Sequence, residues 1–146
     1  MQQIVNLMSN IKKIKLGLDI HGVIDANPNL FSIISNLLVS NDHEVHIITG
    51  KEISDDLVNK LLQFKIKYTH LFSITSYHKN AGSGVSYDDK GRPWMDEEVW
   101  NATKSWYCNK HKIDLHIDDS DIYGKYFKTP YLKYCKATLS EETEDY

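Results

Sequence analysis

The sequence has few of the residues that hold together small extracellular domains or bind structural zinc. Its 146 residues include two cysteines, Cys108 and Cys135, and their separation matches no common zinc-ligand spacing. A disulfide framework is therefore not expected, and reduced thiols are typical of the cytoplasm. No apolar run reaches the roughly 20 residues of a membrane-spanning helix, and the first residues lack the apolar core of a signal peptide. We expect a cytoplasmic protein with no membrane partner.

The sequence also lacks an excess of positive charge. It has 17 Lys and Arg against 20 Asp and Glu, a formal net charge of −3. Non-specific binding of nucleic acid depends on Lys and Arg that neutralise phosphates, so we do not expect it here. A hydrophobic content of 41% and a charged content of 25% are typical of a globular domain, and the length suits one domain.

Strand-like and helix-like segments alternate along residues 14–136. Apolar runs ending at polar or glycine residues predict strands, and apolar residues at i, i+3 and i+4 predict helices. The predicted strands are 14–19, 43–49, 68–76, 113–118 and an edge strand 131–135, and the predicted helices are 27–40, 54–66 and 95–110, with a turn or short helix at 120–127. This alternation predicts an α/β, Rossmann-like fold, with a mainly parallel sheet of about five strands and helices on both faces.

Two of these helices carry apolar stripes that we expect to pack on the sheet. They consist of Leu30, Ile33, Ile34, Leu37 and Leu38 in the first helix, and of Leu57, Val58, Leu61, Leu62 and Ile66 in the second. Residues 1–13 are assigned to an N-terminal extension and residues 137–146 to an acidic C-terminal tail. Residues 77–95 are rich in glycine and aspartate, which favours a loop or small hairpin that acts as a flap.

Acidic residues end two of the predicted strands. Asp19 follows an apolar strand and comes just before a glycine turn, and Asp118 and Asp119 end the fourth strand. In an open α/β sheet, ligands bind beyond the carboxyl ends of the strands. Carboxylate oxygens are suitable ligands for Mg²⁺, which also accepts phosphate oxygens. The sequence therefore predicts that these acids converge on a shared Mg²⁺.

Two further residues fit a site that binds phosphate. Thr49 ends the second strand with a hydroxyl and precedes Gly50, and Lys104 lies in the helix before Asp118. Carboxylates, a hydroxyl and an ammonium at one edge of a sheet can stabilise a transferring phosphoryl group. Each feature has a simpler explanation when taken alone, because a strand-end Asp often caps a helix and a lone Thr or Lys is usually a surface or packing residue. Their order along the chain argues for a common site.

The remaining histidines give no metal-binding pattern in the sequence. His43, His46, His70, His78, His111 and His116 share no metal-ligand spacing with one another. We assign His116 to packing within its strand, and Cys108 to a half-buried, unreactive position.

These motifs resemble those of the haloacid dehalogenase (HAD)-like phosphatases. The first motif of that family is a strand ending in Asp-x-Asp-Gly, which is similar to Asp19-Ile20-His21-Gly22 here. The second, a strand ending in Thr or Ser, is similar to Ile47-Ile48-Thr49-Gly50. The third, a helical Lys, is similar to Lys104, and the fourth, paired acids, is similar to Ile117-Asp118-Asp119. The resemblance covers about residues 14–136.

The resemblance implies a Mg²⁺-dependent phosphohydrolase acting on phosphomonoesters. Asp19 would be the nucleophile that forms an aspartyl-phosphate, and Mg²⁺ would be held by Asp19, by the backbone carbonyl of His21, and by Asp118 and Asp119. Thr49 and Gly50 would bind substrate together with Lys104, which would also offset charge beside Asp19. The residues of the fourth motif also resemble those of nucleotidase-like members of the family.

One position departs from the family pattern. The second Asp of the first motif, usually the general acid and base, is His21 here. Imidazole can transfer protons near neutral pH, and Asp25 is an alternative. The departure leaves open a second function, a catalytically weak or silent relative that binds metal and phosphate ligands. A phosphoacceptor, receiver-like domain is a third reading, which the glycine turn after Asp19 fits less well.

The spacing of the motifs leaves no room for a large cap domain. One helix fills the interval between Asp25 and Thr49, and residues 77–95 are too few for a second domain. The resemblance then implies an open site, suited to a phosphorylated small molecule, to the phosphorylated end of a larger molecule, or to closure by a second copy in a homo-oligomer. Four flap residues could stack on a base or sugar or pack the flap onto the domain: Tyr77, Tyr87, Arg92 and Trp94.

Overall fold

The computed structural model describes residues 12–136, which form an α/β fold around one parallel sheet. Its five strands are β1 (Lys15–Leu18), β2 (Glu44–Thr49), β3 (His70–Ser73), β6 (Leu115–Asp118) and β7 (Tyr131–Lys133). Their order is β3-β2-β1-β6-β7, and every neighbouring pair is parallel. The predicted fold class is therefore confirmed, including the absence of a large cap.

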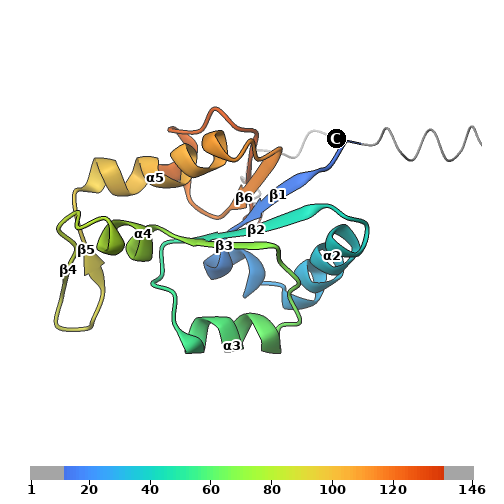
Figure 1. Ribbon diagram of the computed structural model, residues 1–146, viewed down its shortest axis with the longest axis horizontal. Coiled ribbons are helices and arrows are strands. Elements are labelled where there is room, and N and C mark those ends of the chain that lie inside the picture. The colour runs from blue at the N-terminus through green and yellow to red at the C-terminus, as the bar shows by residue number, and fades with distance from the viewer. Residues whose placement is uncertain (1–11, 137–146) are drawn as a thin grey trace, which may run out of the picture.

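Helices cover both faces of this sheet. The helices are α2 (Pro28–Ser40), α3 (Asp55–Gln63), α4 (Ile74–Asn80), α5 (Glu97–Lys110) and α6 (Asp121–Gly124). A turn, η1 (Ile20–Ile24), follows β1, and its backbone is not helical at His21 and Gly22. Helices α2 and α3 lie on one side of the sheet and α5 on the other (Figure 1). Asn27, Ser54 and Asp96 begin α2, α3 and α5 by accepting a backbone N–H in the first turn, the usual role of such residues at an N-cap.

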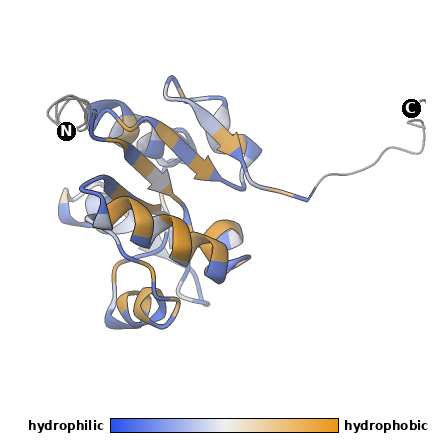
Figure 2. Cartoon of the chain, turned by 90° about the vertical axis from the view of Figure 1, so that its right-hand side faces the viewer, coloured by the Kyte–Doolittle hydropathy of each residue, from blue (hydrophilic) through white to orange (hydrophobic). Residues whose placement is uncertain are grey.

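The core has two layers, one on each side of the strands. The larger layer joins the strands to α2 and α3 through residues such as Leu18, Phe31 and Leu61. The smaller layer joins the sheet to α5 and includes Tyr107 and Cys108. The strands between these layers are coloured mainly hydrophobic (Figure 2), as expected for a parallel sheet buried on both faces.

The apolar stripe predicted for α2 is partly wrong. Leu30, Ile33 and Leu37 are exposed, and the helix buries Phe31 and Ser35 instead. The Ser35 hydroxyl donates to the Ser32 carbonyl and accepts from the Lys67 N–H, so burial leaves no polar atom of this side chain unpaired. In α3, Leu57 and Leu61 are buried, while Val58 and Leu62 are exposed.

The third strand ends earlier than predicted. It stops at Ser73, and residues 74–76, predicted as strand, begin helix α4. The Ser73 side chain accepts a hydrogen bond from the Ser76 N–H at 3.0 Å, which caps the new helix. The predicted flap, 77–95, therefore starts with the end of α4 and continues as a two-stranded hairpin of β4 (Ser86–Tyr87) and β5 (Pro93–Trp94).

The two cysteines differ in their exposure to solvent. Cys108 is fully buried rather than half-buried, and Cys135, just after β7, is exposed. Burial raises the pKa of Cys108 to about 12.

Among the described residues, no helix combines the length and the apolar character needed to cross a membrane. The predicted acidic tail and most of the predicted N-terminal extension lie outside residues 12–136.

Candidate active site

The predicted acidic residues meet at the carboxyl edge of the sheet. Asp19 follows β1, Asp118 ends the neighbouring strand β6, and the Asp19 N–H donates to the Ile117 carbonyl at 3.0 Å. One carboxylate oxygen from each of Asp19, Asp118 and Asp119 lies within 4.8 Å of the other two. The chain leaves β1 toward β2 on one side and returns to β6 on the other, so these acids lie where the strand order reverses, the usual ligand site of such sheets.

Lys104 on α5 brings the nearest positive charge into this group. Its side chain is 1% exposed, and its Nζ lies 2.7 Å from Asp118 Oδ2 and 3.2 Å from Asp19 Oδ1. The ammonium also lies 4.5 Å from the ring centre of Tyr123. Burial alone would lower the pKa of Lys104, but the charges of Asp19 and Asp118 raise it above its ordinary value. Lys104 is therefore positively charged in the folded protein.

Asp118 is held in place by a histidine for which this role was not predicted. His116 is fully buried and its Nε2 lies 2.9 Å from Asp118 Oδ2, so the assignment of His116 to packing alone is wrong. Burial lowers the pKa of His116, and the neutral ring donates its Nε2–H to the carboxylate. Burial would raise the pKa of Asp118, but hydrogen bonds from His116 and Lys104 hold it well below its ordinary value. His116 and Asp118 are alternate residues of β6, so their side chains share one face. This spacing in the sequence could have indicated the contact.

Asp19 and Asp119 have less positive charge around them than their ionised forms need. Burial raises the pKa of Asp19 to about 6, against the opposing charge of Lys104. Burial and the charge of Asp118 also raise the pKa of Asp119. Lys104 is shared between two of the three acids, so a further cation would stabilise their ionised forms. Carboxylate oxygens at this spacing could hold a divalent cation.

Gly22 allows the turn after Asp19 to pass close to Asp119. Its φ of +76° is a conformation that other residues rarely adopt. A Cβ atom at this position would lie 2.1 Å from Asp119 Oδ2. Asp25 closes the same turn, because its Oδ1 accepts the Gly22 N–H at 2.7 Å.

His21 lies at the mouth of the site with its side chain 94% exposed. Its Nδ1 is 3.3 Å from Asp25 Oδ2. Asp25 therefore contacts the His21 imidazole through one carboxylate oxygen and the Gly22 N–H through the other. The ring also lines the cleft described below. It is therefore open to solvent and within the site, while Asp25 is occupied by hydrogen bonds within the turn.

Thr49 and Gly50 lie at the end of β2, beside the acids. Thr49 is buried, and its Oγ1 accepts the Lys51 N–H at 3.2 Å. The Gly50 carbonyl accepts the Thr75 hydroxyl at 2.6 Å. A Cβ at position 50 would lie 2.9 Å from the Trp100 ring, so glycine here allows α5 to approach the strand end.

A cleft of about 610 Å³ opens above these residues. Six of the seven predicted site residues line it: Asp19, His21, Thr49, Gly50, Lys104 and Asp119. The seventh, Asp118, is fully buried. Further lining residues were not predicted from the sequence, among them two lysines and two aromatic residues: Lys51, Lys90, Trp100 and Tyr123. The β4–β5 hairpin contributes Lys90 and Arg92 to the lining of the cleft.

Of the four flap residues considered for stacking, only Arg92 lines this cleft. Arg92 also pairs with Asp88, with Nε and Oδ2 2.8 Å apart. Tyr77 packs against Phe72 and Trp106. The Tyr87 hydroxyl donates to Glu52, and Trp94 lines a separate pocket. Tyr77 and Tyr87 thus pack on the domain, as the alternative reading of these residues proposed.

Comparisons of the chain with protein-family models, with curated proteins and with solved structures found no match.

Proposed function

We propose that this protein is a Mg²⁺-dependent phosphohydrolase of the HAD-like type, acting on a phosphomonoester through an aspartyl-phosphate on Asp19. The observation that carries the proposal is the grouping of Asp19, Asp118 and Asp119 around the buried Lys104 at the floor of an open cleft. A carboxylate nucleophile, an ammonium and a strand-end hydroxyl in one place suit phosphoryl transfer.

In the proposed first step, an Asp19 carboxylate oxygen attacks phosphorus and forms an O–P bond. The bond from phosphorus to the leaving oxygen breaks, and that oxygen keeps the electron pair and takes a proton from the His21 imidazolium. Water then attacks the aspartyl-phosphate, gives its proton to His21, and releases inorganic phosphate with the Asp19 carboxylate restored. Lys104 and Thr49 bind the phosphoryl oxygens during both steps.

The donor set fits a divalent metal as well as this chemistry. Asp19, Asp118 and Asp119 would hold Mg²⁺, together with the His21 carbonyl. The bound ion would offset the negative charge that gathers on the phosphoryl oxygens. Gly22 supports the same arrangement, because it allows the turn carrying His21 to lie against Asp119.

Hydrolysis of p-nitrophenyl phosphate with Mg²⁺ tests this function. We expect turnover in the wild type and its loss in Asp19→Asn, which keeps the shape of the side chain and removes its nucleophilic charge. Asp42→Asn is the matched control, because Asp42 is exposed and has a φ of +62° that asparagine tolerates. Equal turnover in the wild type and Asp19→Asn would overturn the proposed role.

A second function, a silent relative that binds metal and phosphate, is favoured by one observation. The position expected to carry the general acid is occupied by His21, whose side chain is almost fully exposed. Isothermal titration of Mg²⁺, with phosphate added afterwards, separates the two functions. Binding of both ligands without turnover would support the silent relative, and turnover that depends on Asp19 would exclude it.

A further inference from the structure

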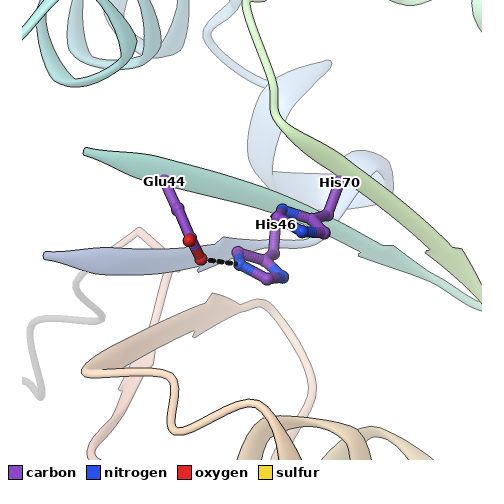
Figure 3. A group of neighbouring side chains, drawn as sticks. All are labelled: Glu44, His46 and His70. Atoms are coloured by element: carbon purple, nitrogen blue, oxygen red, sulfur yellow. Dashed lines mark hydrogen bonds and ion pairs between the residues drawn. The ribbon is translucent and has the colours of Figure 1, made fainter. Parts of the chain in front are cut away.

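A second group of potential metal ligands lies near the opposite edge of the sheet, toward the amino ends of its strands. Glu44 and His46 are alternate residues of β2, so their side chains share one face. His70 opens β3 and is the register partner of His46. One ligand atom from each residue lies within 4.8 Å of the other two, and Figure 3 shows the three side chains grouped on one side of β2 and β3.

His46 is the fixed member of this group. Its side chain is 1% exposed, its Nδ1 lies 2.8 Å from the Tyr107 hydroxyl, and its Nε2 lies 2.8 Å from Glu44 Oε2. One ring nitrogen is thus held by a helix residue while the other faces a carboxylate. Histidines that bind metals are commonly oriented in this way, by a polar partner on the nitrogen away from the ion.

His70 is the movable member. It is exposed, and its ring stacks on that of His46 with centroids 4.0 Å apart and planes 4° from parallel. Its Nδ1 lies 2.9 Å from Thr69 Oγ1, and its Nε2 has no hydrogen bond among residues 12–136. Because the planes are parallel, the lone pairs of the two rings do not converge. A shared ion therefore requires the exposed His70 ring to rotate out of the stack.

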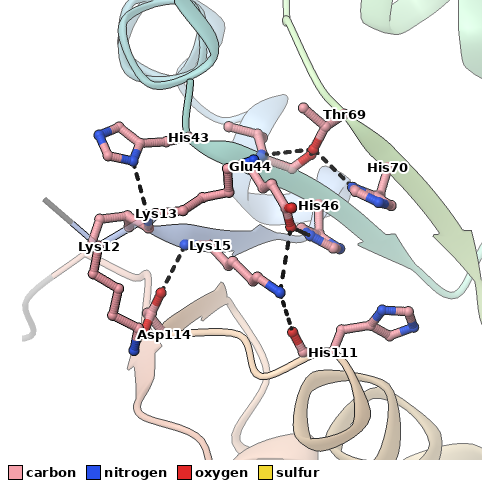
Figure 4. Close-up of polar contacts among 12 residues, drawn as sticks. Lys12, Lys13, Lys15, His43, Glu44, His46, Thr69, His70, His111 and Asp114 are labelled. Carbon is pink, nitrogen blue, oxygen red and sulfur yellow. Dashed lines mark hydrogen bonds and ion pairs between the residues drawn. The ribbon is translucent and has the colours of Figure 1, made fainter. Parts of the chain in front are cut away.

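The ionisation states of His46 and Glu44 favour a bound cation, whereas the charge of the neighbouring Lys15 opposes it. Burial lowers the pKa of His46, which keeps its ring neutral as a metal ligand must be. The hydrogen bond with His46 lowers the pKa of Glu44, which keeps that carboxylate ionised. Lys15 is the neighbouring cation, with Nζ 3.9 Å from Glu44 Oε2 and 3.1 Å from the His111 carbonyl (Figure 4). The His111 ring centre lies 5.9 Å from that of His46.

We propose that Glu44, His46 and His70 form a second metal site, which binds a divalent ion of the zinc class. The ion takes His46 Nε2, a Glu44 oxygen and a His70 nitrogen, and water completes the tetrahedron. The proton on His46 moves from Nε2 to Nδ1, and the Nδ1–H then donates a hydrogen bond to the Tyr107 oxygen. Imidazole with one carboxylate suits Zn²⁺, whereas the three-carboxylate cleft suits Mg²⁺. This site does not depend on the proposed phosphohydrolase activity.

Zinc titration of the full chain, in competition with a chromophoric zinc chelator and with excess Mg²⁺ present, tests the site. We expect one Zn²⁺ per chain, and at least a 10-fold loss of affinity in His70→Ala and in Glu44→Gln. His70 is exposed, so its replacement is not expected to unfold the protein. His43→Asn is the matched histidine control, because it keeps an acceptor for the Ile14 N–H, and its affinity for zinc is expected to stay unchanged.

A second measurement locates the ion directly. On addition of Zn²⁺, ¹⁵N spectra of the imidazoles should show metal-bound His46 Nε2 and a protonated Nδ1. Tyr107→Phe should weaken binding about 10- to 100-fold, the effect typical of losing a residue that orients a ligand. The proposal is overturned if His70→Ala and Glu44→Gln bind zinc as tightly as the wild type. It is also overturned if Asp19→Asn abolishes the tight binding, because the ion would then lie in the carboxylate cleft.

Discussion

At the scale of single residues, carboxylate and imidazole pairs on strands recur on the α5 side of the sheet. Glu44 and His46 alternate on β2, and His116 and Asp118 alternate on β6. Each pair shares a face because alternate strand residues point the same way. The strand-end acids were predictable from their position after apolar runs. The roles of His46 and His116 were not, because they depend on burial and on partners contributed by other elements.

His21→Asp tests the proton transfer in the proposed reaction. If the other chemistry is intact, the carboxyl group should raise turnover, by up to the roughly 10²- to 10⁴-fold that general acid–base catalysis contributes. Steady-state kinetics with p-nitrophenyl phosphate measures the change. No gain in a variant that still binds Mg²⁺ would mean that His21 does not limit the reaction.

Gly22→Ala tests the close contact between the turn and Asp119. The positive φ alone should cost about 1–3 kcal/mol of stability, and the contact with Asp119 should add to this cost and weaken Mg²⁺ binding. Gly84→Ala is the control, since Gly84 has a φ of +66° but open space around its Cβ position. Urea unfolding and Mg²⁺ titration provide the comparison. If the two variants lose equal stability, the contact with Asp119 does not contribute to the cost of Gly22→Ala.

At the scale of elements, the errors in the predicted structure have local causes. The apolar residues of α2 cover more than one face, and periodicity alone did not show that Phe31 and Ser35 would be buried. The strand predicted through Ser76 ended at Ser73 because a side-chain cap started a helix among residues that also suit strands. The parallel pairing was predictable, because regular alternation of strands and helices leaves few arrangements, whereas the strand order β3-β2-β1-β6-β7 comes from the structure alone.

The β4–β5 hairpin supplies a prediction about substrate binding. Lys90 lines the cleft from the hairpin, and Lys51 lines it from the end of β2. If both contact a second anionic group of the substrate, their replacement by Gln should raise KM for such a substrate by up to about 5-fold each, the effect of an exposed ion pair. KM for p-nitrophenyl phosphate should not change. Lys128→Gln provides an exposed control with the same loss of charge, and an equal rise in KM for this control would contradict the prediction.

At the scale of the whole molecule, buried histidines make stability depend on pH. Burial lowers the pKa of His46, His78 and His116. Below the ordinary histidine pKa near 6.5, the unfolded chain therefore binds more protons than the folded protein. Stability should be complete above that pH and fall as pH decreases through it, by up to about 1.4 kcal/mol per pH unit for each group. The raised pKa of Asp19 acts in the opposite sense below about pH 6.

His78→Gln isolates one of these contributions. The His78 Nε2 lies 2.8 Å from Thr103 Oγ1, and a Gln amide can keep this hydrogen bond without titrating. Urea unfolding at pH 7.5 and pH 6.0 should show a smaller loss of stability in the variant than in the wild type. An identical loss in both proteins would show that His78 does not contribute to the pH dependence.

The two cysteines differ in a way that has a practical use. Cys108 is buried in the smaller core layer, while Cys135 is exposed just after the edge strand β7. Since the thiolate is the reactive form, a maleimide dye should attach at Cys135 and leave Cys108 untouched. The native chain thus already carries a unique labelling position, from which fluorescence could follow the protein without an engineered cysteine.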